Sequence, residues 1–145
     1  MIEEQFVSFD TAKMLKEAGF DVPCRGVYVT DRTGYYEFRE YDNKQTKDDL
    51  CWNTDDGFQY EYLAPTQALA ARWLREKFGI HIFTNYFFED GTWFYVNVDL
   101  KESDEVRAIH PDIRSYQSSE EAFEAGLKEA IKMIKNKDYE EDNVQ

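Results

Sequence analysis

The sequence predicts an α+β fold, in which an antiparallel sheet built from about three hairpins is packed by three amphipathic helices. Two observations predict this class. In three segments, apolar residues recur every three or four positions beside residues that cap helices. Between these segments, runs rich in aromatic and β-branched residues flank turns that contain Gly and Asp. Because the strands come in runs between helices, their order favours an antiparallel sheet over a parallel, doubly wound one.

Each predicted helix has its own end signals. Ser8 can cap the first helix, and Pro65 stands at the start of the second. In the third helix, Ser118 and Glu121 have the spacing of a capping box. The helices are expected over residues 8–19, 65–79 and 118–137, and the first two close on a glycine.

Two hairpins are expected between the first and second helices. The strands of the first, 27–30 and 35–41, flank a turn that ends in Gly34. Those of the second, 50–54 and 58–63, flank the turn 55–57. A three-residue loop with Gly57 in a left-handed conformation would place five apolar residues on one face: Leu50, Trp52, Phe58, Tyr60 and Tyr62. Residues 42–49 and 101–117 are expected to be irregular.

The third hairpin, 81–88 with 93–100, is the clearest of the three. A two-residue turn at Asp90 and Gly91 would put Phe87 opposite Phe94. One face, which includes Phe83, Phe87, Phe94 and Val98, is then expected in the core. The other carries four aromatic residues with polar tips or edges: Tyr86, Phe88, Trp93 and Tyr95. This face could be half-exposed and serve as a binding surface, but the three amphipathic helices favour the alternative that a helix covers it.

The composition sets limits on the function. The net charge is −13 and 17% of the residues are aromatic, which together exclude disordered and collagen-like chains. An acidic surface repels phosphates, so neither nucleic acid nor an anionic membrane is expected as a direct partner. We expect a single domain over residues 1–137, followed by an acidic tail over 138–145. The sequence shows no signal peptide and no apolar run of membrane-spanning length, which predicts a cytoplasmic protein.

Residues with catalytic or metal-binding chemistry are few. The sequence has no Gly-rich phosphate loop, nucleophile elbow or metal-binding Cys/His pattern, so no cofactor and no metal are expected. Cys24 and Cys51 are expected to be reduced and largely buried, with a disulfide between them as the alternative. His81 is interpreted as a structural histidine. If the protein is an enzyme, its candidate catalytic residues form one loop cluster: Arg107, His110, Asp112 and Arg114.

Three segments resemble small uncharacterised proteins encoded by bacterial prophages and mobile elements. They are residues 8–20 (SFDTAKMLKEAGF), 64–82 (APTQALAARWLREKFGIHI) and 120–130 (EEAFEAGLKEA). The resemblance covers less than half of the chain. It implies an intracellular accessory protein of a mobile element, and it implies no activity, cofactor or catalytic residue.

We therefore expect a non-enzymatic module that binds a protein partner or associates with itself. Two surfaces could do this: the aromatic face of the third hairpin, and the basic cluster of Arg72, Arg75 and Lys77. That cluster could instead complement the helix dipole and pair with nearby carboxylates. Two alternative functions remain, an acidic mimic of nucleic acid that blocks a host DNA-binding protein, and a small enzyme of unrecognised type.

Overall fold

The computed structural model describes residues 4–50, 60–100, 107–109 and 115–143, and the side chains of 107–109 and 137–143 are left aside. Within these residues the fold is α+β, with three α-helices and antiparallel strands in two sheets, which confirms the predicted class. The chain divides into two compact units, residues 1–66 and 67–145, and each is described by itself.

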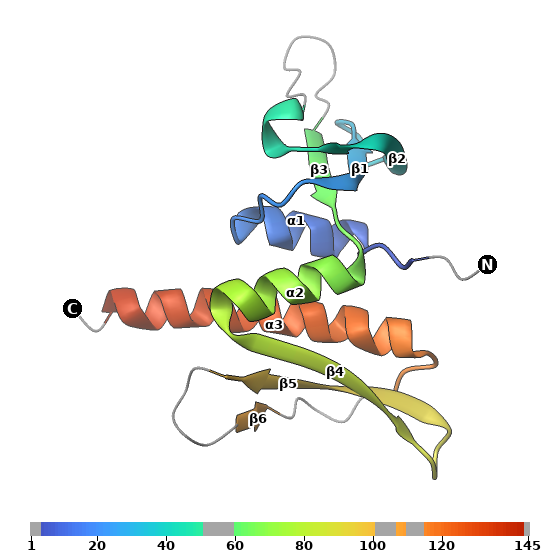
Figure 1. The fold of residues 1–145 in the computed structure, drawn as a ribbon, viewed down its shortest axis with the longest axis vertical. Helices are drawn as coiled ribbons and strands as arrows, with labels where there is room; N and C mark the ends of the chain where they lie inside the picture. The colour runs from blue at the N-terminus through green and yellow to red at the C-terminus, as the bar shows by residue number, and fades with distance from the viewer. Residues whose placement is uncertain (1–3, 51–59, 101–106, 110–114, 144–145) are drawn as a thin grey trace. The chain divides into compact units, whose positions relative to one another are not determined.

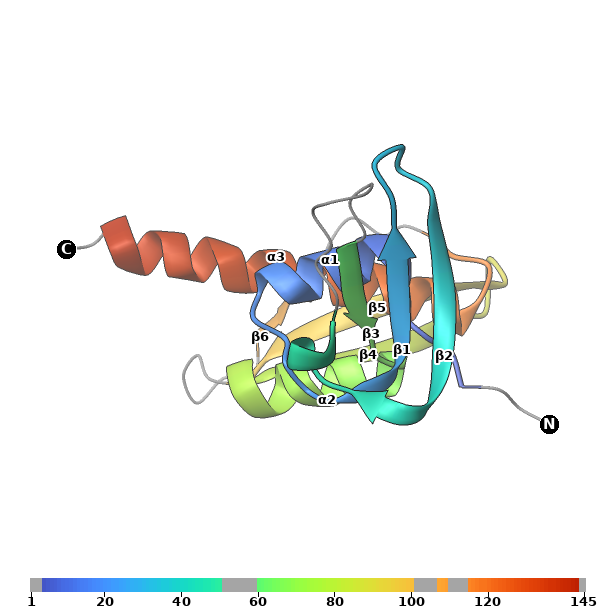
Figure 2. The same cartoon turned by 90° about the horizontal axis from the view of Figure 1, so that it is seen from above.

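The first unit carries one helix and one three-stranded sheet. Helix α1(Phe9–Glu17) begins where the sequence predicts, because the Ser8 hydroxyl accepts the Thr11 backbone N–H at 3.3 Å. The sheet has the order β2-β1-β3, and Figure 2 shows its strands side by side. Their bounds are β1(Cys24–Thr30), β2(Tyr36–Gln45) and β3(Tyr60–Ala64).

One feature of this sheet differs from the sequence-based expectation, and a second was not predicted. Strand β2 continues to Gln45 and is followed by the short 3-10 helix η1(Lys47–Asp49), in a stretch expected to be irregular. Strand β3 pairs with β1, which it meets at Gly26 and Ala64. The predicted 55–57 turn, with Trp52, Phe58 and Cys51, lies outside the described residues.

Aromatic residues form one layer of the first unit. Tyr28 lies between its cross-strand partners Phe38 and Tyr62. Phe9 of α1 stacks on Tyr36 with ring centroids 4.3 Å apart. A side chain on Gly26 is excluded, because a Cβ there would come within 2.3 Å of the Ala64 carbonyl oxygen. The aromatic rings therefore pack beside Gly26, where only a glycine leaves enough room.

The second unit carries two helices and a three-stranded sheet, in which a short strand joins a long hairpin. Its elements are α2(Gln67–Phe78), β4(Ile80–Phe87), β5(Thr92–Asp99), β6(Arg107–Ile109) and α3(Ser119–Asn143), and the strand order is β4-β5-β6. Figure 1 shows α3 lying across the hairpin with α2 beside it. The Gln67 side-chain amide joins the two helices by donating to the Glu120 carbonyl at 3.0 Å. Helix α3 continues through most of the acidic segment 138–145.

The hairpin keeps the predicted faces but changes the predicted pairs. Phe87 lies opposite Thr92, and Tyr86 opposite Trp93, so each pair is shifted by two residues from the expected one. The last strand pair is Phe87 with Thr92, so the loop has four residues, 88–91, instead of the two expected. Inside the loop, the Gly91 N–H donates to the Phe87 carbonyl at 2.9 Å. A shift of two residues leaves every side chain on its original face.

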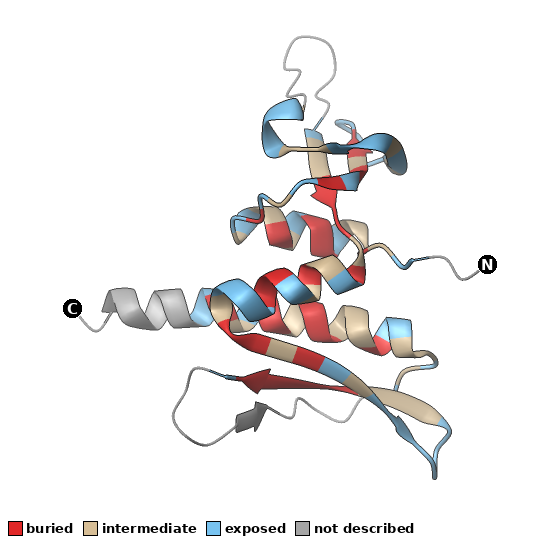
Figure 3. Cartoon of the chain, viewed as in Figure 1, coloured by how far each residue is buried: buried red, intermediate tan, exposed pale blue. Residues whose placement is uncertain are grey.

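Helix α3 covers the inner part of the face for which exposure and coverage by a helix were the alternatives. It packs on Ile82, Tyr95 and Asn97, all of which are buried, and Figure 3 shows buried stretches in β4 and β5. The opposite face was expected in the core, and this is wrong for its outer half, where Phe83 and Phe87 are each 38% exposed. The sequence could not distinguish the two faces because both carry aromatic residues. The position of α3 determines which of them is buried.

Candidate interaction surface

Three aromatic side chains form an open cluster at the turn end of the hairpin. We call Tyr86, Phe88 and Trp93 the aromatic end. The Tyr86 ring centroid lies 5.6 Å from that of Phe88 and 5.2 Å from that of Trp93, with the planes inclined by 71° and 57°. Phe88 is 91% exposed and Tyr86 41%, whereas Trp93 is half-buried. Exposure of this size is uncommon for phenylalanine, which is usually buried.

The aromatic end is open because α3 begins too late to cover it. The first residue of the helix, Ser119, has its hydroxyl 2.8 Å from that of Thr84. Thr84 is the cross-strand partner of Tyr95, and the next pair on the same face towards the turn is Tyr86 with Trp93. The turn end of the hairpin, with this pair and the loop, therefore extends beyond the start of α3, as the ribbon in Figure 1 shows.

Of the four aromatic residues predicted for this face, Tyr95 does not belong to the open cluster. It is 9% exposed, and a Cβ on Gly126 of α3 would lie 3.2 Å from its ring. The expectation that a helix covers the face is thus correct for Tyr95 and incorrect for Tyr86 and Phe88. Trp93 is held in place through its backbone, which exchanges hydrogen bonds of 2.8 and 2.9 Å with Tyr116.

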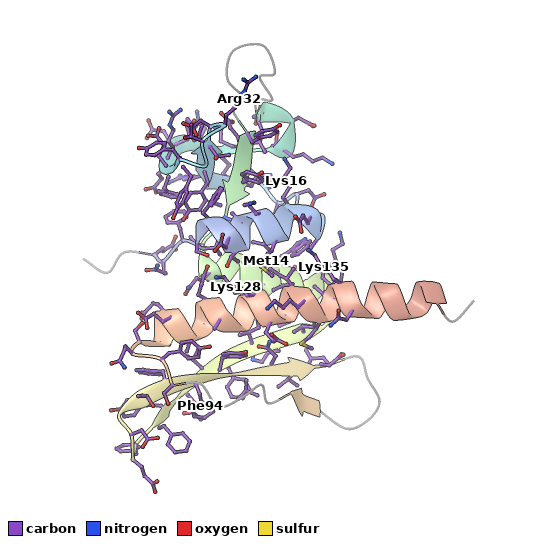
Figure 4. The ribbon with its side chains drawn as sticks, turned by 180° about the vertical axis from the view of Figure 1, so that it is seen from behind. Met14, Lys16, Arg32, Phe94, Lys128 and Lys135 are labelled. Atoms are coloured by element: carbon purple, nitrogen blue, oxygen red, sulfur yellow. The ribbon has the colours of Figure 1, made fainter. Side chains whose placement is uncertain are left out.

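The opposite face of the hairpin adds a second group of rings that sequence reasoning had assigned to the core. Phe87 and Phe94 have ring centroids 5.6 Å apart. Figure 4 places Phe94 on the side of the hairpin away from α3, in agreement with the alternation of side chains along β5. The turn half of the hairpin consequently presents aromatic side chains on both faces.

Exposed carboxylates occur in the segments that carry and follow the aromatic end, and these segments contain no lysine or arginine. Glu89 and Asp90 are exposed in the loop, and Glu120 and Glu121 are exposed in the first turn of α3. Residues 78–100 and 115–127 include no Lys or Arg.

The start of α3 is fixed by two hydrogen bonds. The Glu121 carboxylate accepts the Gln117 backbone N–H at 3.2 Å, while the Ser118 hydroxyl accepts the Glu121 N–H at 3.1 Å. The Ser118 half of the predicted capping box is therefore present, whereas the Glu121 carboxylate accepts the N–H one residue before Ser118; together they cap the start of α3.

The basic cluster on α2 is largely engaged within its own helix. The Arg72 Nε lies 2.9 Å from a Glu76 carboxylate oxygen, and both side chains are exposed. The hydrogen bond from Arg72 lowers the pKa of Glu76. Lys77 Nζ lies 5.4 Å from the centroid of the Trp73 ring. Arg75 is exposed in the last turn, where a cation complements the helix dipole. The ion-pair and dipole interpretation therefore accounts for this cluster.

Groups suited to catalysis do not converge in the part of the chain that the structure describes. No group of three or more His, Cys, Asp or Glu side chains able to hold a metal occurs there. A cavity of about 20 Å³, lined by Lys16, Phe20, Leu50 and Leu63, has room for about one water molecule. Of the predicted loop cluster, His110, Asp112 and Arg114 lie outside the described residues, and Arg107 falls in β6.

The remaining candidates are structural. His81 is half-buried, with its ring centroid 6.0 Å from that of Phe83. Cys24 is a free, buried thiol whose pKa is raised to about 11 by burial, so it is protonated near neutral pH. Among the described residues, no helix is long and apolar enough to cross a membrane.

The comparisons with known proteins add no further assignment. The chain matches no protein-family model, no curated protein and no solved structure.

Proposed function

We propose that this protein is a non-enzymatic, cytoplasmic interaction module of a prophage or mobile element, and that it binds a protein partner through the aromatic end. The observation that supports this proposal is the 91% exposure of Phe88 beside the exposed ring of Tyr86. Contact between an apolar ring and water is unfavourable in free energy. Burial of the ring against a partner removes this contact, and the side chain loses little conformational entropy. Large aromatic side chains are also those that contribute most to binding at protein interfaces.

The arrangement of the hairpin supports a preformed binding surface. Tyr86 and Trp93 are cross-strand partners whose ring centroids lie 5.2 Å apart, so the hairpin holds these two rings together before any partner arrives, and Phe88 follows β4 directly in the loop. Rings that are already in place lower the conformational entropy that this protein loses on binding, compared with a disordered loop. The basic cluster on α2 is a weaker candidate, because Arg72 is already paired with Glu76.

The test is affinity capture with matched variants. The wild-type protein, the double variant Tyr86→Ser with Phe88→Ser, and Tyr35→Ser are each immobilised and exposed to bacterial host extract. Tyr35 is a suitable control because it is 62% exposed in the first unit. A protein retained by the wild type and Tyr35→Ser but lost from the double variant is then purified and titrated against all three.

The expected result is direct binding that weakens at least tenfold in the double variant and is unchanged in Tyr35→Ser. Equal retention of every captured protein by all three chains would contradict the proposal. Sedimentation of the wild type alone over a range of concentrations tests self-association, and a dimer that the double variant abolishes would replace the foreign partner by a second copy.

A further inference from the structure

Among the described residues, no Lys or Arg lies over a ring of the aromatic end, whereas several other rings of the chain have such a cation. Lys13 Nζ lies 5.4 Å from the centroid of Phe9, and Lys16 Nζ lies 4.9 Å from that of Tyr62. In the second unit, Lys77 lies over Trp73. These distances are within the range at which an ammonium group is attracted to the face of a ring. The segments that build the aromatic end, 78–100 and 115–127, have no Lys or Arg to offer.

The charged residues in the described segments 78–100 and 115–127, apart from His81, are all acidic. Glu89 and Asp90 come from the loop that carries Phe88, and Glu120 comes from the start of α3. All three side chains are exposed. An approaching lysine or arginine would therefore meet ring faces and carboxylates at once, and both attract cations.

A second copy of the chain is a poor occupant on the same grounds. Each copy carries a net charge of −13, and its own aromatic end brings further carboxylates. Facing like charges at close range weakens association and lowers its rate. The same carboxylates attract a segment that carries Lys or Arg and repel the acidic surface of a second copy.

We propose that the aromatic end binds a basic segment of the partner protein, with a Lys or Arg side chain over the rings of Tyr86 and Phe88 and beside Glu89 and Asp90. This inference rests on the proposed function, and it adds the chemistry of the partner. Trp93 is the least exposed ring of the cluster and packs against Tyr86. Its backbone is held by two hydrogen bonds with Tyr116.

The probe is a fluorescein-labelled nonapeptide of alternating Lys and Gly, compared with Ser-Gly and Glu-Gly peptides of equal length. Binding is measured by fluorescence anisotropy at low and at physiological salt. An acidic chain attracts any basic peptide to some extent, so variants must separate the rings from the general charge. Tyr86→Ser with Phe88→Ser removes rings and leaves the charge unchanged, and Tyr35→Ser is its control.

A second pair of variants tests the carboxylates. Glu89→Gln with Asp90→Asn raises the net charge by two at the aromatic end, and Asp42→Asn with Asp48→Asn does the same at exposed positions in the first unit. We expect the ring variant to weaken binding of the Lys-Gly peptide about 5- to 30-fold, as the loss of one or more cation–π contacts predicts. The loop carboxylate variant should weaken it more than its control.

The result that overturns the inference is a Lys-Gly peptide that binds all five chains alike, or no better than the Ser-Gly peptide. The two proposals fail separately. If the purified partner is lost from the ring variant but is insensitive to salt and to Glu89→Gln with Asp90→Asn, the interaction function stands and the basic chemistry is wrong. If no partner depends on the aromatic end, the proposed function itself is wrong.

Discussion

Gly126 is the position where the packing of α3 on the hairpin can be tested with a predictable sign. A Cβ at this position would lie 2.9 Å from Ile82 Cγ2 and 3.2 Å from two atoms of the Tyr95 ring. Both neighbours are buried, and the approaching atoms lie near the base of each side chain, so neither can simply rotate away. Gly126→Ala therefore forces the helix away from the sheet.

The magnitude follows from two opposing effects. Extra volume in a packed core costs about 1–3 kcal/mol, whereas replacing glycine by alanine inside a helix stabilises it by about 1 kcal/mol. We expect a net loss of about 1 kcal/mol in the free energy of unfolding of the second unit. In an unpacked helix the same substitution would be stabilising, so the sign alone distinguishes the two situations.

Urea unfolding followed by circular dichroism measures this change, with Ile82→Ala and the double variant completing a cycle. Ile82→Ala alone should cost about 2–5 kcal/mol, because it empties a buried site. In the double variant the new methyl group enters the space that Ile82 left, and the cost should be at least 1 kcal/mol below the sum of the single costs. If Gly126→Ala stabilises the protein by about 1 kcal/mol and the cycle is additive, α3 does not contact the hairpin at this point.

Three further predictions concern exposure, titration and capping. Phe88→Ala should change the free energy of unfolding by less than about 0.5 kcal/mol, whereas Tyr95→Ala should cost about 3 kcal/mol or more; equal effects in urea unfolding would place the two rings in similar surroundings. The pKa of Cys24 is raised to about 11, above its ordinary value near 9, so its contribution to stability should be complete below pH 9 and fall by about 2–3 kcal/mol as the pH rises to 11. Unfolding of the wild type and Cys24→Ala across this range checks it, and parallel curves would contradict it. Ser8→Ala removes the cap of α1 and should cost about 1 kcal/mol in thermal or urea unfolding, with Ser115→Ala as an exposed control outside any helix.

The sequence predicted best what short-range chemistry decides. Helix α1 starts after Ser8, and α2 ends before Gly79, whose φ of 73° only glycine adopts easily. The two faces of the β4–β5 hairpin were also predicted correctly, because alternation along a strand is a local property. The loop length was not, because an Asp-Gly pair fits both two-residue and four-residue loops.

What the sequence did not predict depends on contacts between distant segments. Strand β3 pairs with β1, whose partner residues lie 30 to 38 positions earlier in the chain, and the sequence did not predict this pairing. The choice of buried face on the hairpin was made by α3, and Asn97 shows why the pattern misled. Its side chain is fully buried and donates to the Gly126 carbonyl at 3.1 Å, whereas a strand pattern reads asparagine as solvent-facing.

The exposure of the aromatic end is itself determined by short-range interactions at the start of α3. One more helical turn before Ser119 would carry the helix over Tyr86 and Trp93, and two interactions oppose it. Ser118 and Glu121 form a cap that satisfies the backbone at this start. Tyr116, two residues earlier, is held in backbone pairing with Trp93 and cannot join a helix without losing both hydrogen bonds. The strand pairing that fixes Trp93 therefore also keeps Tyr86 and Phe88 uncovered.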